Sequence, residues 1–215
     1  MHQDWGLRQV PAELRETYRS RGWWDDTSLG AMVEAGLDKQ ASAIFQVRSK
    51  VRPWDGTFAD VDRGARALAA SLQGQGVGPG SVVVLQLPNW VEAGIAFWAA
   101  AYLGAVVVPV VHFYGPKEVG YILDVTAPDV VVTADRFGRT DHLEMYDGLL
   151  ATRPGPLWLV AGDTPAAKLP ARATAFAALL DAAPLSGALQ VDPDAPAVIG
   201  FTSGTTRDPK GVVHS

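Results

Sequence analysis

The segment from Thr202 to Gly211 holds the residues whose types and spacing are best suited to chemistry. Four hydroxyl side chains fall within five residues, at Thr202, Ser203, Thr205 and Thr206. Hydroxyl groups and backbone N–H groups both donate hydrogen bonds to phosphate oxygens. The segment therefore predicts a site for a phosphorylated ligand.

The other residues of this segment support the same interpretation. Gly204 lets the backbone approach a ligand closely, because it has no side chain. Pro209 stiffens the chain, and Lys210 places a compact positive charge where a polyphosphate would lie. The segment differs from a Walker A loop, which ends in Gly-Lys-Ser/Thr and leads into a helix, because Gly211 follows Lys210 here. The pattern indicates a nucleotide phosphate cradle of another type.

Upstream of this segment, helical and strand patterns alternate along the chain. We expect strands at 43–47, 81–87, 105–111, 130–133, 157–160 and 196–201, a turn at 52–56, helices at 57–73, 91–103, 116–126 and 141–152, and a short helix at about 174–181. The strands are continuous apolar runs, as expected when helices cover both faces of a parallel sheet. The predicted fold class is therefore α/β, with a largely parallel sheet flanked by helices.

Local signals define the start of the helix at 57–73. Thr57 and Asp60 have the spacing of a capping box, in which each side chain accepts a hydrogen bond from the other residue's backbone N–H. Apolar residues then recur at spacings of three and four, which predicts one buried face. That face comprises Phe58, Val61, Ala65, Leu68 and Leu72.

The stretch from Ala93 to Val111 contains no charged residue and is long enough to raise the question of a membrane span. Gly104 and Pro109 interrupt it, and its second half is rich in valine. A helix up to Leu103, followed by a glycine stop and a buried strand, accounts for the same residues. We therefore predict core structure and no membrane span.

Composition excludes several classes of function. The net charge of −5 and the isoelectric point near 5.3 give no general attraction to nucleic acid. The absence of cysteine excludes disulfides and thiolate metal sites and fits a reducing cytoplasm, and the N-terminal residues lack the apolar core of a secretory signal. The four histidines show no metal-ligand spacing, so no metal site is predicted. His112 follows a predicted strand; we interpret it as a structural residue, with a role in a ligand site as the alternative.

The order of these elements predicts three regions. Residues 1–56 form a lead-in of short helices and a hairpin, and residues 57–190 form a parallel α/β subdomain. Residues 191–215 begin an incomplete second subdomain that carries the phosphate-binding loop, after an Ala- and Pro-rich connection.

The segment Thr202–Thr206, followed by Pro209–Val212, resembles the phosphate-binding signature of the adenylate-forming (AMP-binding) superfamily. This superfamily includes acyl- and aryl-CoA synthetases, peptide-synthetase adenylation domains and firefly luciferase. The resemblance extends over about 18–215, with further matches at 57–63, 87–89 and 103–109. Arg207 departs from the pattern, because most members have Gly there, and this puts the detailed conformation of the loop in question.

The resemblance implies an acyl-CoA synthetase of the fatty-acid-CoA ligase type. Such an enzyme activates a small-molecule carboxylic acid with ATP and Mg²⁺ to an acyl-adenylate, and coenzyme A then displaces AMP to form a thioester. By the same resemblance, the residues that would bind the ATP phosphates are Thr202, Ser203, Gly204, Thr205, Thr206, Lys210 and Gly211.

The later motifs of the superfamily do not occur in this sequence, so we assign no catalytic residue in this chain and expect no adenylate formation by the chain alone. Two alternatives stay open: a carrier-protein thiol as the acceptor, and a non-catalytic product that binds a nucleotide or a partner. We also expect an exposed apolar face that favours a homodimer.

Overall fold

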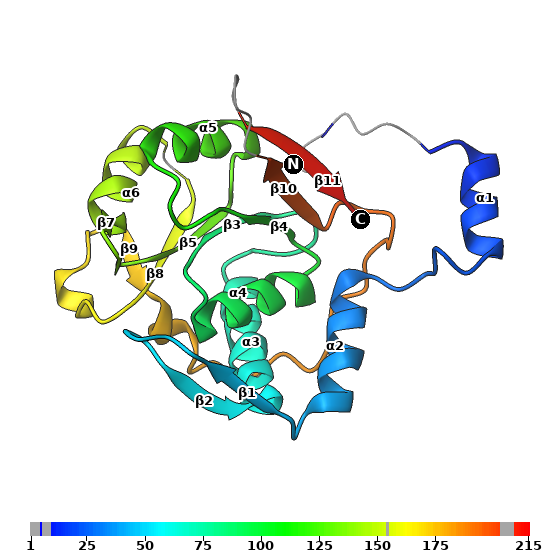
Figure 1. Ribbon diagram of the computed structural model, residues 1–215, viewed down its shortest axis with the longest axis horizontal. Coiled ribbons are helices and arrows are strands. Elements are labelled where there is room, and N and C mark those ends of the chain that lie inside the picture. Colours follow the sequence, from blue (N-terminus) through cyan, green and yellow to red (C-terminus); the bar gives the residue numbers. More distant parts are fainter. Residues whose placement is uncertain (1–4, 6–9, 154, 203–208) are drawn as a thin grey trace.

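The computed structural model describes residue 5 and residues 10–153, 155–202 and 209–215, and its centre is a seven-stranded sheet (Figure 1). All strand pairings in this sheet are parallel except that between β10 and β11. In their order across the sheet, the strands are β11 (Lys210–His214), β10 (Val198–Thr202), β4 (Val106–Pro109), β3 (Val82–Gln86), β5 (Val130–Ala134), β8 (Leu157–Ala161) and β9 (Ala173–Ala175). The largely parallel α/β fold predicted from the apolar strands is confirmed.

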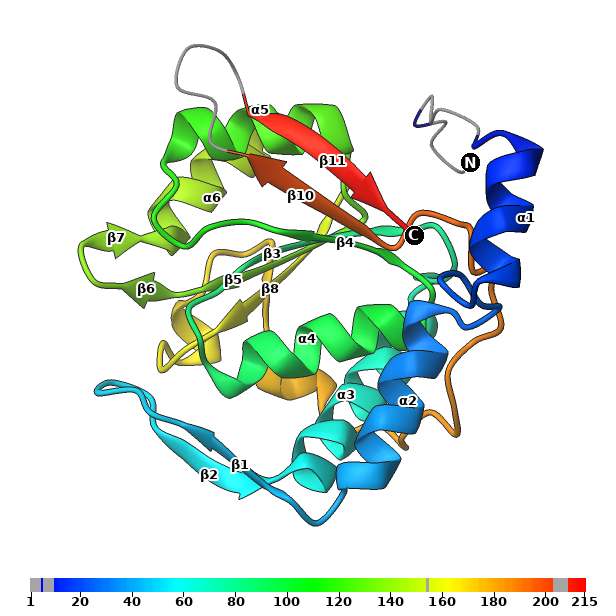
Figure 2. The same ribbon diagram turned by 45° about the vertical axis from the view of Figure 1, so that its right-hand side comes forward.

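Helices cover both faces of this sheet, which is why its central strands are buried along their whole length (Figure 2). One face carries α2 (Leu29–Gln40), α3 (Phe58–Gln73) and α4 (Val91–Tyr102), and the other carries α5 (Pro116–Thr126) and α6 (His142–Ala151). Each face has its own apolar cluster, with Leu68 and Leu72 in the first and Ile122 and Trp158 in the second. Helix α1 (Ala12–Ser20) lies at the side of this assembly and buries none of its residues.

Two antiparallel hairpins lie outside the main sheet. The first pairs β1 (Ile44–Val47) with β2 (Trp54–Thr57), and the second pairs β6 (Arg136–Phe137) with β7 (Thr140–Asp141). Aromatic rings attach the first hairpin to the helical layer: the Phe45 ring centroid lies 5.2 Å from that of Phe58 and 6.0 Å from that of Trp98. The base of this hairpin is therefore anchored by apolar contacts.

The local signals predicted from the sequence are present. Thr57 and Asp60 form the predicted capping box of α3. The structure adds a second cap, because the Ser28 side chain accepts a hydrogen bond from the backbone N–H of Ala31 at the start of α2. Helix α4 ends at Tyr102, and Gly104 follows with a φ of 62°, a conformation that favours glycine. No helix in the described part of the chain is long and apolar enough to cross a membrane.

Four local predictions were wrong or incomplete. The segment predicted as a turn at 52–56 contains β2, because Trp54 and its neighbours pair with β1. Strand β9 lies where the helix at about 174–181 was expected to begin, and only the 3₁₀ helix Phe176–Leu179 follows it. Strand β11 and the β6–β7 hairpin were missed, since both depend on pairing partners that local periodicity does not show.

The last residues extend the same sheet. Residues 191–215 were assigned to the start of a second subdomain, and in the described part of this region β10 pairs with β4 while β11 pairs with β10. The division of the chain into subdomains stays a prediction.

Candidate functional site

The described part of the predicted phosphate-binding segment lies at one end of the β10–β11 hairpin. Thr202 ends β10, Lys210 begins β11, and the two residues are partners in the antiparallel ladder. Gly211 pairs with Phe201, and a Cβ atom added to Gly211 would lie only 3.1 Å from Ile199 Cγ2. The side chains of Thr202 and Lys210 are exposed, so both are accessible to a ligand.

The central residues of this segment lie outside the described residues. They are Ser203, Gly204, Thr205, Thr206, Arg207 and Asp208. The structure therefore places three of the seven predicted phosphate-binding residues, namely Thr202, Lys210 and Gly211.

A hollow of about 750 Å³ lies at the carboxyl edge of the sheet. Strands β3, β4 and β5 are neighbours, yet the chain after β3 enters α4 on one face, whereas the chains after β4 and β5 enter α5 and α6 on the other. Open α/β sheets bind ligands where the connections diverge in this way. We call this cavity the switch-point hollow; it is lined by Arg48, Ser49, Lys50, Val51, Arg52, Pro88, Asn89, Trp90, His112, Asp135, Arg136, Phe137, Gly138 and Asp163.

The lining of the switch-point hollow favours an anion. It includes the cationic side chains of Arg48, Lys50, Arg52 and Arg136 and two carboxylates. Helix α4 begins at this hollow, and its N-cap residue is Trp90, whose indole has no acceptor atom with which to cap the first N–H groups. An uncapped helix N-terminus adds partial positive charge to the lysine and arginine charges around it.

Arg52 connects three parts of this lining. Its Nε and Nη2 atoms donate to Glu92 Oε1 at 2.8 Å and 2.6 Å, and Nη1 donates to Asp163 Oδ1 at 2.5 Å. The guanidinium carbon also lies 5.3 Å from the centre of the Trp90 ring. The hydrogen bond to Glu92, more than any other contact, raises the pKa of Arg52 above its ordinary value, so its charge is constant at any physiological pH.

Asp135 fixes the loop that carries Asp163. Its Oδ2 atom accepts hydrogen bonds from the backbone N–H groups of Asp163 and Thr164 and from the Thr164 hydroxyl, at 2.8–3.0 Å. Burial by itself would raise the pKa of Asp135, but these bonds and one from the N–H of Arg136 outweigh it and lower that pKa below its ordinary value. Gly162 allows this approach, since a Cβ atom there would lie 2.0 Å from Asp135 Cγ.

His112 lies in the wall of the switch-point hollow, with its ring edge-on to those of Phe113 and Phe137. Its carbonyl oxygen is 3.4 Å from Nε2 of His142, which is fully buried. Burial lowers the pKa of His142, so this histidine is neutral near pH 7. The position of His112 in the lining is compatible with the site role weighed as the alternative from the sequence.

Three residues of this lining were not predicted from the sequence as site residues: Arg52, Asp135 and Asp163. Asp135 and Asp163 each follow the end of a predicted strand, and the carboxyl ends of parallel strands meet at one edge of a sheet. That position was the signal that could have found them. Arg52 carried no comparable signal, because its partners lie 40 and 111 positions away in the sequence.

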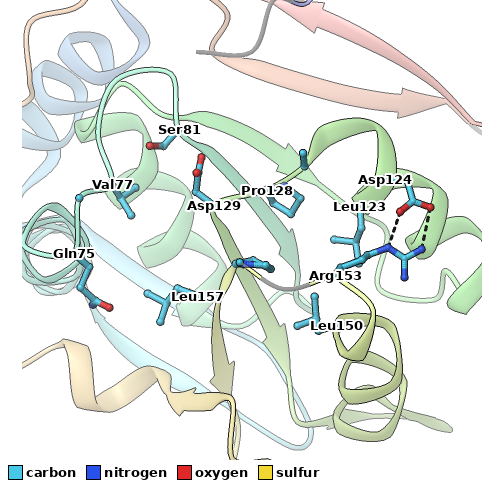
Figure 3. Close-up of a pocket in the computed structure, with 14 residues that line it drawn as sticks. Gln75, Val77, Ser81, Leu123, Asp124, Pro128, Asp129, Leu150, Arg153 and Leu157 are labelled. Carbon is cyan, nitrogen blue, oxygen red and sulfur yellow. Dashed lines mark hydrogen bonds and ion pairs between the residues drawn. The ribbon is translucent and has the colours of Figure 1, made fainter. Parts of the chain in front are cut away.

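A second hollow, of about 590 Å³, opens at the opposite, amino-terminal edge of the sheet (Figure 3). Its charged side chains already have partners within the protein. Arg153 forms a two-pronged ion pair with Asp124 at 2.7 Å and 2.9 Å, and the Asp129 carboxylate accepts a hydrogen bond from the N–H of Val82. In the switch-point hollow, by contrast, two of the four cationic side chains, those of Arg48 and Lys50, form no ion pair within the described part of the chain, so this hollow is the stronger candidate for a ligand site.

Comparison with known proteins identifies the family. The model of the AMP-binding enzyme family matches residues 38–215. Salicyl-AMP ligase / salicyl-S-ArCP synthetase of Mycobacterium tuberculosis is 29% identical, over 95% of this chain and 36% of that protein. Medium-chain fatty-acid–CoA ligase of Escherichia coli is 26% identical, over 94% of this chain and 35% of that protein.

Solved structures agree with this result. The apo structure of Mycobacterium smegmatis MbtA aligns with a TM-score of 0.81 and 28% identity, over 97% of this chain and 37% of that one. The chain thus spans about a third of the length of the relatives that it matches, 36% and 35% for the two ligases above. Because the family model covers most of the sequence, the chain belongs to the AMP-binding enzyme family, the adenylate-forming ligases.

Proposed function

We propose that this chain provides the phosphate-binding part of an enzyme that activates a carboxylic acid with ATP and Mg²⁺ and transfers the acyl group to a thiol. The family match supports the activation of a carboxylate as an adenylate. The later motifs that the resemblance implies for catalysis are not in this sequence, so we propose that the 215-residue chain alone forms no adenylate.

We propose that Thr202, Ser203, Gly204, Thr205, Thr206, Lys210 and Gly211 hold the ATP phosphates. The observation that carries this proposal is the pairing of Thr202 with Lys210, the last residue of β10 with the first residue of β11. This arrangement places an exposed hydroxyl and an exposed ammonium group next to each other at the two ends of the segment 203–208. A hydroxyl donor and a point charge together match the needs of a polyphosphate.

We further propose that coenzyme A approaches through the switch-point hollow. Coenzyme A is a polyanion that carries an adenine ring, and the hollow combines four cationic side chains with the rings of Trp90, His112 and Phe137. Trp90 is 6% exposed, and its Nε1 atom has no hydrogen-bond partner among the described residues, so an acceptor on a ligand would satisfy a buried donor. A carrier-protein thiol is the alternative acceptor, and the name of the salicyl-S-ArCP synthetase supports it.

The acid substrate is proposed only as a class. Fatty acids are our narrower proposal, and the relatives named for medium-chain fatty acids, salicylate and 4-coumarate support both alkyl and aromatic carboxylic acids. The acid is small and its carboxylate is the reacting group in either case. A reducing compartment such as the cytoplasm is the proposed setting, on the ground that the sequence contains no cysteine.

Titration of the chain with ATP tests the phosphate-binding proposal. We expect Lys210→Gln to weaken ATP binding by about tenfold or more, because a charge-assisted contact to phosphate is lost. Lys168→Gln is the matched control, since Lys168 is an exposed lysine in a 3₁₀ helix before β9. Equal affinities of both variants would contradict the assignment of Lys210. Carboxylate-dependent ATP–pyrophosphate exchange by the chain alone would contradict the proposal that these 215 residues form no adenylate.

A non-catalytic product that binds a nucleotide or a partner is the second candidate function. It predicts ATP binding with no exchange activity, even in a longer polypeptide that contains this chain. Self-association through an apolar face is proposed with it, and sedimentation velocity over a range of concentrations measures that property directly. A sedimentation coefficient that does not change with concentration would exclude the homodimer over that range.

A further inference from the structure

Arg52 lies in the turn between β1 and β2, which forms one wall of the switch-point hollow. Aromatic contacts hold the base of the hairpin, whereas the turn 48–53 extends beyond them toward the carboxyl edge of the sheet (Figure 2). Within the described part of the chain, every hydrogen bond and ion pair from this turn to elements outside the hairpin comes from Arg52. One side chain therefore makes the polar attachment of the turn.

The two partners of Arg52 differ in their environment. The Glu92 side chain is 9% exposed and belongs to the first turn of α4, whereas the Asp163 side chain is 86% exposed and follows β8. Asp163 nevertheless has a fixed backbone, because Asp135 accepts hydrogen bonds from its N–H and from Thr164. Arg52 thus bridges two rigid supports at the rim of the hollow.

Charge gives this bridge a second consequence. Four cationic side chains and two carboxylates line the hollow, and Glu92 lies directly behind Arg52. Loss of Arg52 would remove a cation from the lining and would also leave the buried Glu92 carboxylate without its counterion. An anion that enters the hollow would then meet unpaired negative charge.

We propose that Arg52 is a positioning residue that holds the turn 48–53 as a wall of the switch-point hollow and keeps the hollow receptive to an anionic cosubstrate. The identity of that cosubstrate as coenzyme A rests on the proposed function, whereas the attachment of the turn does not. Arg52 acts through Glu92 and Asp163, and its guanidinium packed on Trp90 keeps the bridge in one place.

Hydrogen exchange of the 215-residue chain tests the attachment. Arg52→Gln should accelerate exchange of the backbone amides of residues 51 and 52, which donate to Ser49 Oγ, by about ten- to a hundredfold, the range expected when a charge-assisted hydrogen bond is lost, while α3 and β3 keep their rates. Arg48→Gln is the matched control, since Arg48 lines the same hollow and, among the described residues, its side chain bonds only to Gln46 of the same hairpin. Arg52→Lys should restore part of the protection. Equal exchange in the Arg52→Gln and Arg48→Gln chains would overturn the proposal.

If Arg52→Gln does not fold, a milder variant still tests the attachment of the turn. Asp163→Asn removes one support and leaves no buried charge unpaired, because Asp163 is exposed. It should produce a smaller increase of exchange in the same residues, and no increase would overturn the attachment.

Titration with coenzyme A completes the test. The affinity for coenzyme A should fall further for Arg52→Gln than for Arg48→Gln. Equal losses would mean that Arg52 contributes only its charge, and would overturn the proposal that it keeps the hollow receptive to an anionic cosubstrate. No binding by the unaltered chain would instead count against the proposed coenzyme A site, and the exchange result would stand independently of it.

Discussion

Thr202 and Lys210 lie opposite each other at the end of the β10–β11 ladder, and Thr202 Oγ1 donates a hydrogen bond to the carbonyl oxygen of Lys210 at 3.4 Å. This long contact is weak, so the hydroxyl is free to turn toward a better acceptor. A phosphate oxygen beside this end of the hairpin would be such an acceptor. The pairing thus links the shape of the hairpin to the proposed binding of ATP.

Thr202→Val tests the hydroxyl separately from the hairpin. Valine has the same branched shape and suits a strand, so the melting temperature should stay unchanged, whereas ATP affinity should fall by about tenfold through loss of one bond to a charged group. Thr202→Ser keeps the hydroxyl and should retain the affinity. Titration calorimetry and thermal melting measure the two properties, and an unchanged affinity for the valine variant would remove Thr202 from the site.

Gln86 should be critical for the loop that forms one wall of the switch-point hollow. Its fully buried side chain donates to the carbonyl oxygens of Val111 and Tyr114 at 3.0 Å and 3.1 Å, and accepts from the Tyr146 hydroxyl at 2.8 Å. Gln86→Leu leaves the two carbonyl oxygens and the Tyr146 hydroxyl without a hydrogen-bond partner, so we expect a loss of about 3–5 kcal/mol in the free energy of unfolding. Tyr146→Phe leaves only the Gln86 side-chain oxygen without its donor and should lower the free energy of unfolding by about 1–2 kcal/mol. Urea unfolding of both variants would contradict this account if their costs were equal.

Asp135 should make stability depend on pH in acid. Its folded pKa lies below the ordinary value of 3.8, so its stabilising contribution is present above that value and is lost as pH falls through the lower folded pKa. Asp135→Asn should therefore cost about 1–3 kcal/mol at pH 7, and the difference from the unaltered chain should shrink below about pH 4. Urea unfolding across this range measures it. The exposed Asp181 supplies the control, because Asp181→Asn should change the free energy of unfolding little at any pH. If Asp135→Asn had the same cost at every pH, the stabilising role assigned to the Asp135 carboxylate would be contradicted.

Gly104 is a position where a single methyl group should be costly. Its φ is 62°, and a Cβ atom there would lie 2.3 Å from Val191 Cγ1. Strain and overpacking together predict that Gly104→Ala lowers the free energy of unfolding by about 2–4 kcal/mol. Gly148→Ala lies in α6 with open space around it and should instead raise stability by about 0.5–1 kcal/mol. Changes of the same sign in the two variants would refute the distinction.

Several features of this protein could be predicted from the sequence because they depend on neighbours within a few residues. The capping box of Thr57 and Asp60, the helix stop at Gly104 and the apolar strands are of this kind. Their free energies come from local hydrogen bonds, backbone sterics and the period of the apolar residues. The segment proposed to bind phosphate was also visible in the sequence, since its hydroxyls, glycine and lysine all fall within residues 202–210.

The tertiary structure alone decided which residues surround the switch-point hollow. Arg52, Glu92 and Asp163 are brought together from a turn, a helix and a loop, across separations of 40 and 111 positions. The pairing of β11 with β10, and the place of β9 at the far edge, were likewise set by partners that no local window contains. Contacts of this kind form only after the sheet has closed the intervening loops, so their energies depend on the assembled fold and leave no periodic trace in the sequence.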